Sequence, residues 1–425
     1  MSVRIESMGF ATPVLERTQH DIGREQAQLW NLSASSQERW QRMVDHCGIE
    51  RRAAVMPLQE IVSLTTAQRM KCFSQHAPAL AARAIEQALA RGNRAAQDIT
   101  DLIVVTCTGF ESPGPLHDIC VQAGLSANVR TSQIGFMGCF GGICGLDAAA
   151  GAALRHEGAV VLLVCVELCS LHLRNDRDAQ NMVASLLFAD GAAALVVSNT
   201  AVLQAFSKRN ALDLLDAHAP KSALETSGAI ALKNNLDMHG ELALGRIQQT
   251  NGDLAIRRVN SITVGPRQAQ RIPDTAHAMS WQITDAGFAM TLDRSVPAHI
   301  ELAAQSSLGD LKQCAIHPGG AAILDAMERG SNARNCGGLS AESLLAARGV
   351  LRDHGNMSSG SVFFVLDRLL QSGATGDMGV IAFGPGLTVD QLQLCVTPIN
   401  ARDAYSDQTK VLQPLSRAPS GMAIG

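Results

Sequence analysis

Three residues of this 425-residue chain stand in local settings that suit nucleophilic chemistry, and the first is a cysteine. Cys139 lies in the glycine-rich segment IGFMGCFGGI, directly before an alanine-rich helical pattern. The start of a helix offers free N–H groups and positive potential, which would lower the pKa of a thiol and hold a thioester oxyanion. Cysteine is also among the most buried residue types, so a structural role for this thiol stays open.

Two further side chains could act with that thiol. His317 ends an apolar run in CAIHPGGA, so its ring is expected at the end of a strand beside a glycine pair, where α/β folds place their sites. Asn356, in GNMSSG, stands at the start of a second predicted helix, where an N-cap role alone would account for it. With Cys139 they would place two hydrogen-bond donors around one thiolate, a set that suits thioester chemistry.

Three other features carry weaker signals. Asp190, in FADGAAA, could be an acid or base, but a carboxylate would oppose thiolate formation, so a turn or backbone-bonding role is favoured. The segment GPGLT from Gly384 lacks the lysine of a P-loop and the pattern of a dinucleotide site, which predicts a tight turn lining a cavity. Cys139 and Cys144 do not share one helix face, so no metal site is expected.

Alternating strands and helices must position these residues, which predicts an α/β layered fold. Short β-branched runs predict buried strands at Leu102 to Thr108, Val160 to Glu167, Ala192 to Ser198, Gln313 to His317 and Gly379 to Phe383. Helical patterns occupy Ala77 to Arg91, Phe140 to Glu157, Ala298 to Leu308, Ala321 to Glu328 and Ser359 to Gln371.

One arrangement occurs twice along the chain: a strand, a glycine-rich helix start and a further strand. An internal duplication is therefore plausible, with paired helices buried between two sheets, although any α/β chain shows some such alternation. We place the first half at residues 1–258 and the second at 259–397. Residues 199–258 lack steady periodicity and are predicted to form a surface insertion, and residues 398–425 a flexible tail.

Composition narrows the function classes. A hydrophobic fraction of 46% with only 17% charged residues indicates a chain that buries much of itself. The net charge of -4 gives no support for nucleic acid or membrane partners. The N-terminus lacks a signal-peptide pattern, and no apolar run is long enough to span a bilayer, so we expect a cytoplasmic protein whose eleven cysteines are reduced thiols.

The chain resembles the chalcone and stilbene synthase-like type III polyketide synthases. One segment, CVELCSLHLR, is more similar to the bacterial members of this family than to the plant members. The motifs agree in type and order: GCFGG around Cys139, LFADGAAAL around Phe188, HPGGAAILD from His317, GNMSSGSVFFVLD around Asn356 and AFGPGLTV from Ala382.

The resemblance implies a thiolase-like five-layered αβαβα fold with two pseudo-duplicated halves, a homodimer, and a catalytic triad of Cys139, His317 and Asn356. It implies that the cysteine takes an acyl group from a starter acyl-CoA. It also implies that His317 and Asn356 promote decarboxylation of malonyl-CoA, and that the resulting enolate attacks the acyl group on Cys139. Repetition and cyclisation would give a pyrone, a resorcinol-type or another aromatic product, with no metal or redox cofactor. The HPGG segment favours CoA over acyl carrier protein.

The resemblance also suggests substrate-binding positions. Phe188 matches one residue that gates the family's CoA tunnel, and Met290 falls at the other gate position, where a flexible thioether could admit a longer acyl chain or simply pack in the core. Arg42, Arg51 and the neighbouring Arg52 lie near the family's CoA-phosphate site.

Some positions depart from the family pattern. Glu50 interrupts the basic pattern of the CoA-phosphate site, and Ser112 replaces a methionine that many plant members push into the partner's cavity. Two other functions remain: a thiolase-fold acyltransferase without malonyl extension, and a partner subunit that kept the fold and lost activity. Starter, number of extensions and cyclisation mode are not readable from the sequence.

Overall fold

A computed structural model describes residues 2–199, 260–307 and 311–398 of the chain. The elements within these ranges belong to one compact unit, made of Met1–Thr200 and Ile262–Val396. Apart from Asn199 and Pro398, the predicted insertion and tail lie outside the described residues.

The main sheet has nine strands in the order β11-β12-β13-β8-β1-β7-β6-β4-β5, and β2-β3 and β9-β10 form two separate two-stranded sheets. The strands are β1 Arg4–Ala11, β2 Leu15–Thr18, β3 Arg51–Ala54, β4 Asp101–Thr106, β5 Arg130–Gly135, β6 Val160–Leu168, β7 Asp190–Ser198, β8 Asn260–Arg271, β9 Met279–Thr284, β10 Gly287–Leu292, β11 Cys314–Ile316, β12 Gly376–Gly384 and β13 Thr388–Pro398.

The strand order repeats within the sheet. Strands β4-β6-β7-β1 of the first half correspond to β11-β12-β13-β8 of the second. In each set the first two strands run parallel and the next pair antiparallel. This confirms the predicted pseudo-duplication. The two predicted sheets are joined, however, because β1 pairs with β8 at Arg4↔Thr263 and Ile5↔Ile262.

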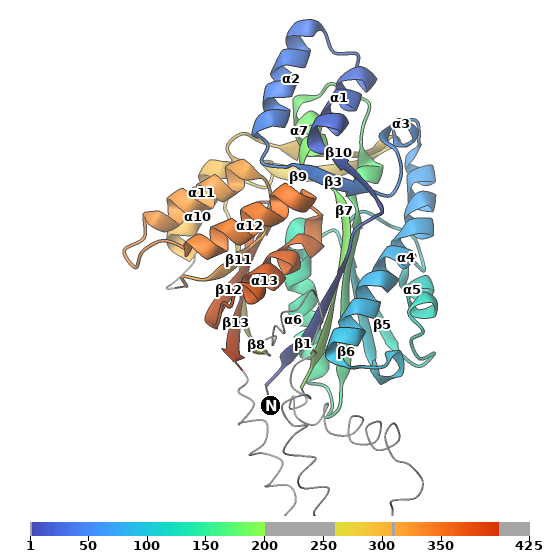
Figure 1. Cartoon of the computed structure of the whole chain (residues 1–425), viewed down its shortest axis with the longest axis vertical. Helices are drawn as coiled ribbons and strands as arrows, with labels where there is room; N and C mark the ends of the chain where they lie inside the picture. The colour runs from blue at the N-terminus through green and yellow to red at the C-terminus, as the bar shows by residue number, and fades with distance from the viewer. Residues whose placement is uncertain (1, 200–259, 308–310, 399–425) are drawn as a thin grey trace, which may run out of the picture. The chain divides into compact units, whose positions relative to one another are not determined.

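Helices lie between the two halves of the sheet and outside both (Figure 1). The central pair, α6 and α13, contacts strands of both halves, whereas α4 covers β1, β6 and β7 from outside and α10, α11 and α12 flank the second half. The helices are α1 Gln19–Leu29, α2 Ala34–His46, α3 Leu58–Ile61, α4 Thr66–Gly92, α5 Leu116–Gln122, α6 Gly141–Ala153, α7 Ala179–Leu187, α10 Val296–Ser307, α11 Ala321–Asn332, α12 Ala341–His354 and α13 Ser361–Gln371.

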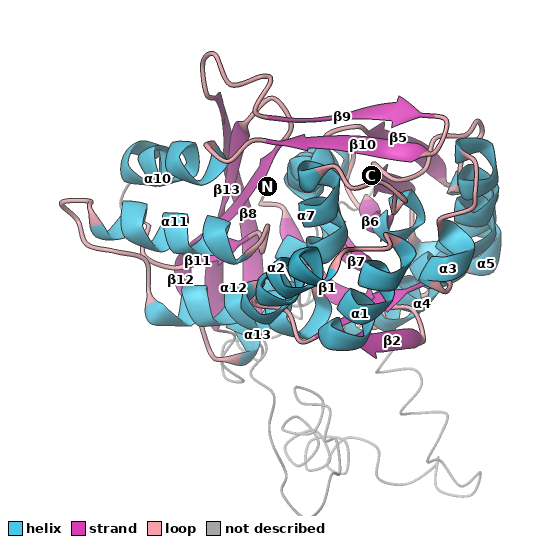
Figure 2. Ribbon diagram, turned by 90° about the horizontal axis from the view of Figure 1, so that it is seen from above, coloured by secondary structure: helices cyan, strands magenta, loops and turns pink. Residues whose placement is uncertain are grey.

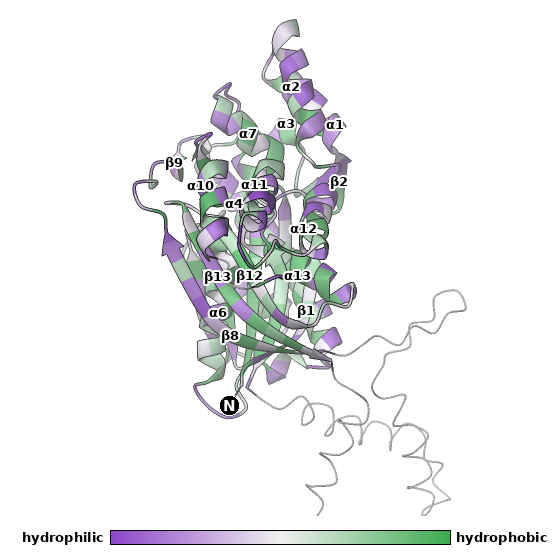
Figure 3. Cartoon of the chain, turned by 90° about the vertical axis from the view of Figure 1, so that its left-hand side faces the viewer, coloured by the Kyte–Doolittle hydropathy of each residue, from purple (hydrophilic) through white to green (hydrophobic). Residues whose placement is uncertain are grey.

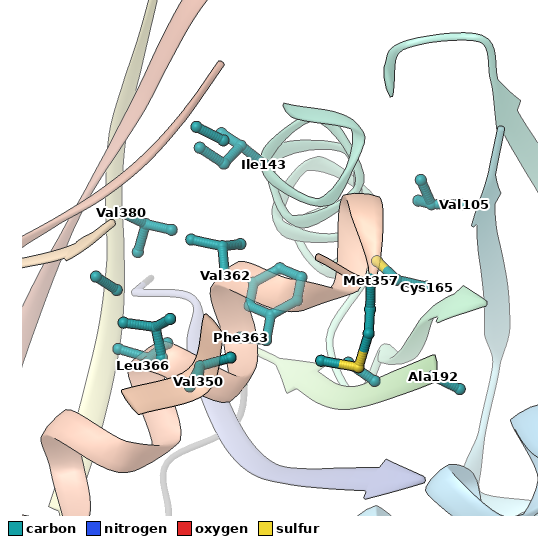
Figure 4. Packing of buried hydrophobic residues seen from close by; sticks show 14 of the residues in the cluster. Val105, Ile143, Cys165, Ala192, Val350, Met357, Val362, Phe363, Leu366 and Val380 are labelled. Atoms are coloured by element: carbon teal, nitrogen blue, oxygen red, sulfur yellow. The ribbon is translucent and has the colours of Figure 1, made fainter. Parts of the chain in front are cut away.

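The core surrounds the two central helices. Figure 4 shows Ile143 of α6 near Val362 and Phe363 of α13, with Val380 on the strand beside them. All four side chains are fully buried. In Figure 3 the strands are largely green, whereas much of the outlying α2 is purple. Burial of these aliphatic side chains contributes roughly 25 cal/mol of free energy per Å² of apolar surface removed from water, and this stabilises the fold. It also determines where the central helices begin.

Boundaries differ from the predictions where the chain turns. The helix predicted from Phe140 is preceded by a 3-10 turn, η2 (Gly138–Phe140), and ends earlier, at Ala153. The sequence analysis did not find the hairpin β9–β10, whose strands lie side by side in Figure 2. The hairpin packs on α7 rather than in the main sheet, so its strands show only a partial alternation of hydrophobic and polar residues.

Candidate active site

Glycines bring Cys139 to the junction of the two halves. Gly138 adopts a φ of +65°, and a Cβ there would overlap the Pro385 ring. A Cβ at Gly142, in the first turn of α6, would overlap the carbonyl oxygen of Ser359. The glycines of the GCFGG motif therefore allow the backbone around Cys139 to touch the backbone of the second half.

Asn356 is held by the backbone of the first half. Its N–H donates to the Leu187 carbonyl at 2.9 Å, and its carbonyl accepts from the Ala189 N–H at 2.9 Å. The side-chain Oδ1 accepts from the Ser358 N–H at 2.8 Å. The expected N-cap position was wrong, because α13 begins only at Ser361, after the 3-10 turn η4 (Ser358–Gly360).

The amide of Asn356 faces the sulfur of Cys139. Because Oδ1 accepts from a backbone N–H, which can only donate, the amide orientation is fixed. The Nδ2 atom lies 4.0 Å from the Cys139 Sγ and 3.5 Å from the Gly319 carbonyl oxygen. The structure therefore brings these two predicted site residues together from opposite halves of the chain.

His317 follows β11, as predicted, and only 1% of its surface is exposed. Its backbone N–H donates to the Ile381 carbonyl at 2.8 Å, which continues the pairing with β12. A Cβ at Gly319 would lie 3.7 Å from the ring Nε2. Both ring nitrogens are buried and have no hydrogen-bond partner within the described residues. Unpaired buried nitrogens cost stability, which is characteristic of functional positions.

The pocket favours neutral forms of the two titratable groups. Burial raises the pKa of the Cys139 thiol to about 12, against the lowering effect of hydrogen bonds with Ser358 and Asn356. Burial also lowers the pKa of His317 to about 3. Desolvation at this buried site therefore opposes the thiolate that the helix start was expected to favour.

A buried carboxylate, Glu167, connects the two halves beneath this site and was missed by the sequence analysis. It is fully buried in β6 and accepts from the Cys107 N–H at 3.0 Å, the Thr108 hydroxyl at 2.7 Å and the Ser359 hydroxyl at 2.6 Å. Its charge contributes to the raised pKa of Cys139. A charged residue inside an otherwise apolar strand was the available signal.

Cys139 lines a cavity of about 130 Å³. The predicted gate residues Phe188 and Met290 line the same cavity, whereas His317 and Asn356 are not among its lining residues. Cys139 is half-buried, unlike the other two members of the predicted triad. Cys169 lines the same cavity and is also half-buried, so the contact with the Asn356 amide is what distinguishes Cys139.

The three arginines expected near CoA differ in position. Arg42 is exposed on α2, and Arg51 is exposed on β3 with its Nη1 3.4 Å from the Glu16 carboxylate. Neither lines the cavity. Arg52 is only 6% exposed and does line it, with its Nη1 2.9 Å from the Ser185 carbonyl oxygen. This last arginine therefore does not lie on the surface with the other two.

The two weaker motifs have the predicted roles. Asp190 accepts from the Val55 N–H at 2.9 Å and from the Ser170 N–H at 2.7 Å, so it binds backbone. Gly384 and Pro385, at the turn between β12 and β13, line the cavity.

Among the described helices, none is both long and apolar enough to cross a membrane.

Cys139 and Asn356 meet at the junction of the two halves of a duplicated α/β fold, an arrangement that suits a condensing enzyme of thiolase-like fold. Family models agree with the fold and the site. Residues 14–201 match the N-terminal domain of chalcone and stilbene synthases, and residues 266–398 match their C-terminal domain. The chain therefore belongs to the chalcone and stilbene synthase family, and it is a condensing acyltransferase of the type III polyketide synthase class.

Curated relatives carry the same class name. The chain is 28% identical over 408 residues to the alpha-pyrone synthesis polyketide synthase-like Pks18 of Mycobacterium tuberculosis, with 91% of this chain and 89% of the relative covered. It is 27% identical over 350 residues to type III polyketide synthase C of Arabidopsis thaliana, with 77% and 75% covered.

Solved structures share the fold. The C-terminal type III polyketide synthase domain of Steely1 from Dictyostelium superposes with a TM-score of 0.74 at 23% identity, covering 94% of this chain and all of that one. PKS-I from the brown alga Ectocarpus siliculosus gives a TM-score of 0.74 at 21% identity, covering 94% and 98%. These likenesses establish the predicted thiolase-like fold.

Proposed function

We propose that this enzyme loads an acyl group from a starter acyl-CoA onto Cys139, extends it with malonyl-CoA and cyclises the product. The observation that supports this most strongly is the half-buried thiol at the wall of a cavity, 4.0 Å from the Asn356 amide. Such a thiol has both access to an acyl donor and a fixed donor group for charge that develops beside it.

Loading begins with proton transfer from the Cys139 thiol to His317. Because burial favours the neutral form of both groups, this transfer would create an ion pair without changing the total charge. The sulfur then attacks the acyl-CoA carbonyl, the new C–S bond forms, and the CoA thiolate leaves with the proton returned by the imidazole. The unpartnered nitrogens of His317 can accept and return this proton.

Extension requires an enolate. In malonyl-CoA, the C–C bond to the carboxylate breaks, carbon dioxide leaves, and the electron pair forms a thioester enolate. Asn356 Nδ2 and a ring N–H of His317 would donate to its oxygen. The enolate carbon attacks the acyl carbonyl on Cys139, and the C–S bond breaks to release the longer chain. These steps require only the CoA thioesters and no further cofactor.

Apolar side chains favour an aliphatic or aromatic starter over a polar one. Leu173, Trp281 and Phe288 line the cavity along with Phe188 and Met290. We propose that the last two gate the entrance, and that the flexible thioether widens it. The mycobacterial relative is named for alpha-pyrone synthesis, which favours a pyrone over a resorcinol-type or other aromatic product.

The exposed cations and the sheet edge suggest how the ligands and a second copy bind. Arg42 is exposed on α2 and Arg51 on β3, two residues before the cavity-lining Ala53, and both would hold the CoA phosphates. The exposed edge strand β5 is followed by Phe136, which is 57% exposed. An exposed strand edge beside an apolar side chain is suited to pairing with a second copy in a homodimer.

The decisive experiment compares the wild type with Cys139→Ala. Purified protein is incubated with ¹⁴C-malonyl-CoA and a panel of short to long acyl-CoAs, and carbon dioxide and labelled products are followed. We expect extended products from the wild type and none from the variant. Loading of Cys139 without malonyl incorporation across the panel would instead establish the simpler acyltransferase, and no loading at all would establish an inactive partner subunit.

A further inference from the structure

A buried guanidinium lies between the cavity and the backbone that holds Asn356. Arg52 donates from Nε to the Gln19 side-chain oxygen at 2.8 Å. Its Nη1 donates to the carbonyl oxygens of Ser185 at 2.9 Å and of Phe188 at 2.5 Å. Both carbonyls belong to the C-terminal end of α7, where a cation is favoured by the helix dipole.

The same region is clamped from a second side chain. Gln19 is 1% exposed, and its Nε2 donates to the Leu186 carbonyl at 2.9 Å. Arg52 and Gln19 together therefore hold three carbonyls at the end of α7. Two of the residues that carry them flank Leu187, which accepts the backbone N–H of Asn356.

Arg52 also touches the backbone next to Asn356. Gly355 has a φ of +70°, and a Cβ there would lie 2.9 Å from the Arg52 Cγ and Cδ atoms. Next to it, Asn356 and Phe188 form a parallel bridge, in which Ala189 donates to the Asn356 carbonyl. The Arg52 side chain thus packs against Gly355, next to Asn356 on one side of the bridge, and donates to the carbonyl of Phe188 on the other side.

We propose that Arg52 is a positioning residue that fixes Asn356 for enolate stabilisation, rather than a ligand of the CoA phosphates. Its buried position, with Nε and Nη1 committed to protein oxygens, distinguishes it from the exposed Arg51 on the same strand. This inference rests on the proposed function, because the enolate step is what Asn356 would serve. Cys139 is loaded before that step, and within the described residues it receives no hydrogen bond from Arg52.

The test is the substitution Arg52→Met, which keeps the methylene packing on Gly355 and removes the hydrogen bonds. Since a displacement of about 1 Å can cost about 100-fold in rate, we expect kcat for carbon dioxide release from malonyl-CoA to fall by roughly that factor. Starter loading of Cys139, measured by intact mass in a single turnover, should stay within about threefold of wild type, with KM unchanged. Arg24→Met, at an exposed arginine on α1, is the matched control for the substitution.

A second readout does not depend on catalysis. Hydrogen exchange of the peptides that contain Ala189 and Asn356 should accelerate in Arg52→Met, whereas exchange of the β4 peptide should not change. If the Met variant does not fold, Arg52→Lys and Gln19→Met remove parts of the same clamp and should give smaller effects in the same peptides.

Two results would overturn the inference. A raised KM for CoA esters with unchanged kcat and unchanged exchange would make Arg52 a phosphate ligand. An equal loss of loading and of carbon dioxide release, again with unchanged exchange at Ala189 and Asn356, would exclude a specific effect on Asn356. A wild type that releases no carbon dioxide would contradict the proposed function, and the exchange experiment would then decide the role of Arg52 alone.

Discussion

The two halves of the molecule place their site residues differently at the start of a central helix. Cys139 lies within the 3-10 turn that leads into α6, whereas Asn356 lies two residues before the 3-10 turn that leads into α13. Cys139 is half-buried and lines the cavity, whereas Asn356 is 2% exposed and bridged to Phe188. The two side chains therefore differ both in their place at the turn and in what packs on them: one is open to the cavity, and the other is held against the first half.

The junction between the turns is the most sensitive point of this arrangement. A valine at Gly142 would overlap the Ser359 carbonyl oxygen, a rigid backbone atom. We expect Gly142→Val to destabilise the fold by about 3 kcal/mol or more and to abolish loading of Cys139. Urea denaturation and intact mass measure the two effects.

The control lies on the same helix. A methyl group at Gly151 of α6 would have no atom outside its own helix within 4 Å, so Gly151→Ala should be stabilising by about 0.5–1 kcal/mol, from helix propensity alone. Equal destabilisation by both substitutions would mean that the close approach of the two halves is not what Gly142 provides.

The reactivity of Cys139 can be tested by the pH dependence of its alkylation. Because burial raises the pKa of the Cys139 thiol to about 12, its thiolate fraction at neutral pH is small. Alkylation of Cys139 by iodoacetamide, followed by peptide mass spectrometry, should therefore rise about 100-fold between pH 7 and pH 9. The same profile is expected for His317→Ala, since a neutral imidazole adds no charge. A rate that is flat across this range would reveal a thiolate–imidazolium pair instead.

The link between the halves should contribute a smaller effect. Glu167→Gln keeps the size of the side chain but replaces one acceptor oxygen by a donor among four hydrogen-bond donors. We expect a loss of about 1–3 kcal/mol in the free energy of unfolding. The exposed Glu157→Gln should change it by less than about 0.5 kcal/mol. Equal effects would show that Glu167 does not hold the halves together.

The smallest predicted change concerns the cavity wall. Met290→Phe replaces a flexible thioether with a ring, which should disfavour longer starters by about tenfold in kcat/KM relative to short ones. Competition between a short and a long acyl-CoA measures this ratio directly. An unchanged ratio would assign Met290 to packing, the alternative that the sequence left open.

The sequence by itself determined which residues are present at the junction and the order of the elements around them. Cys139, His317 and Asn356 stand in short motifs whose glycines and strand endings are local properties, and the buried strands show as apolar runs. The duplication was visible as well, because it repeats a pattern along the chain.

Only the tertiary structure decided the electrostatics and the contacts between distant segments. Three features depend on residues that are far apart in the chain: the raised pKa of the Cys139 thiol, the hydrogen bond between Ser359 and Glu167, and the burial of Arg52. Arg51 and Arg52 are neighbours of one type, and the alternation of a strand sends one to solvent and the other inward. No local pattern reports what the inward side chain will meet, because the carbonyls that it binds, at Ser185 and Phe188, belong to a distant part of the chain.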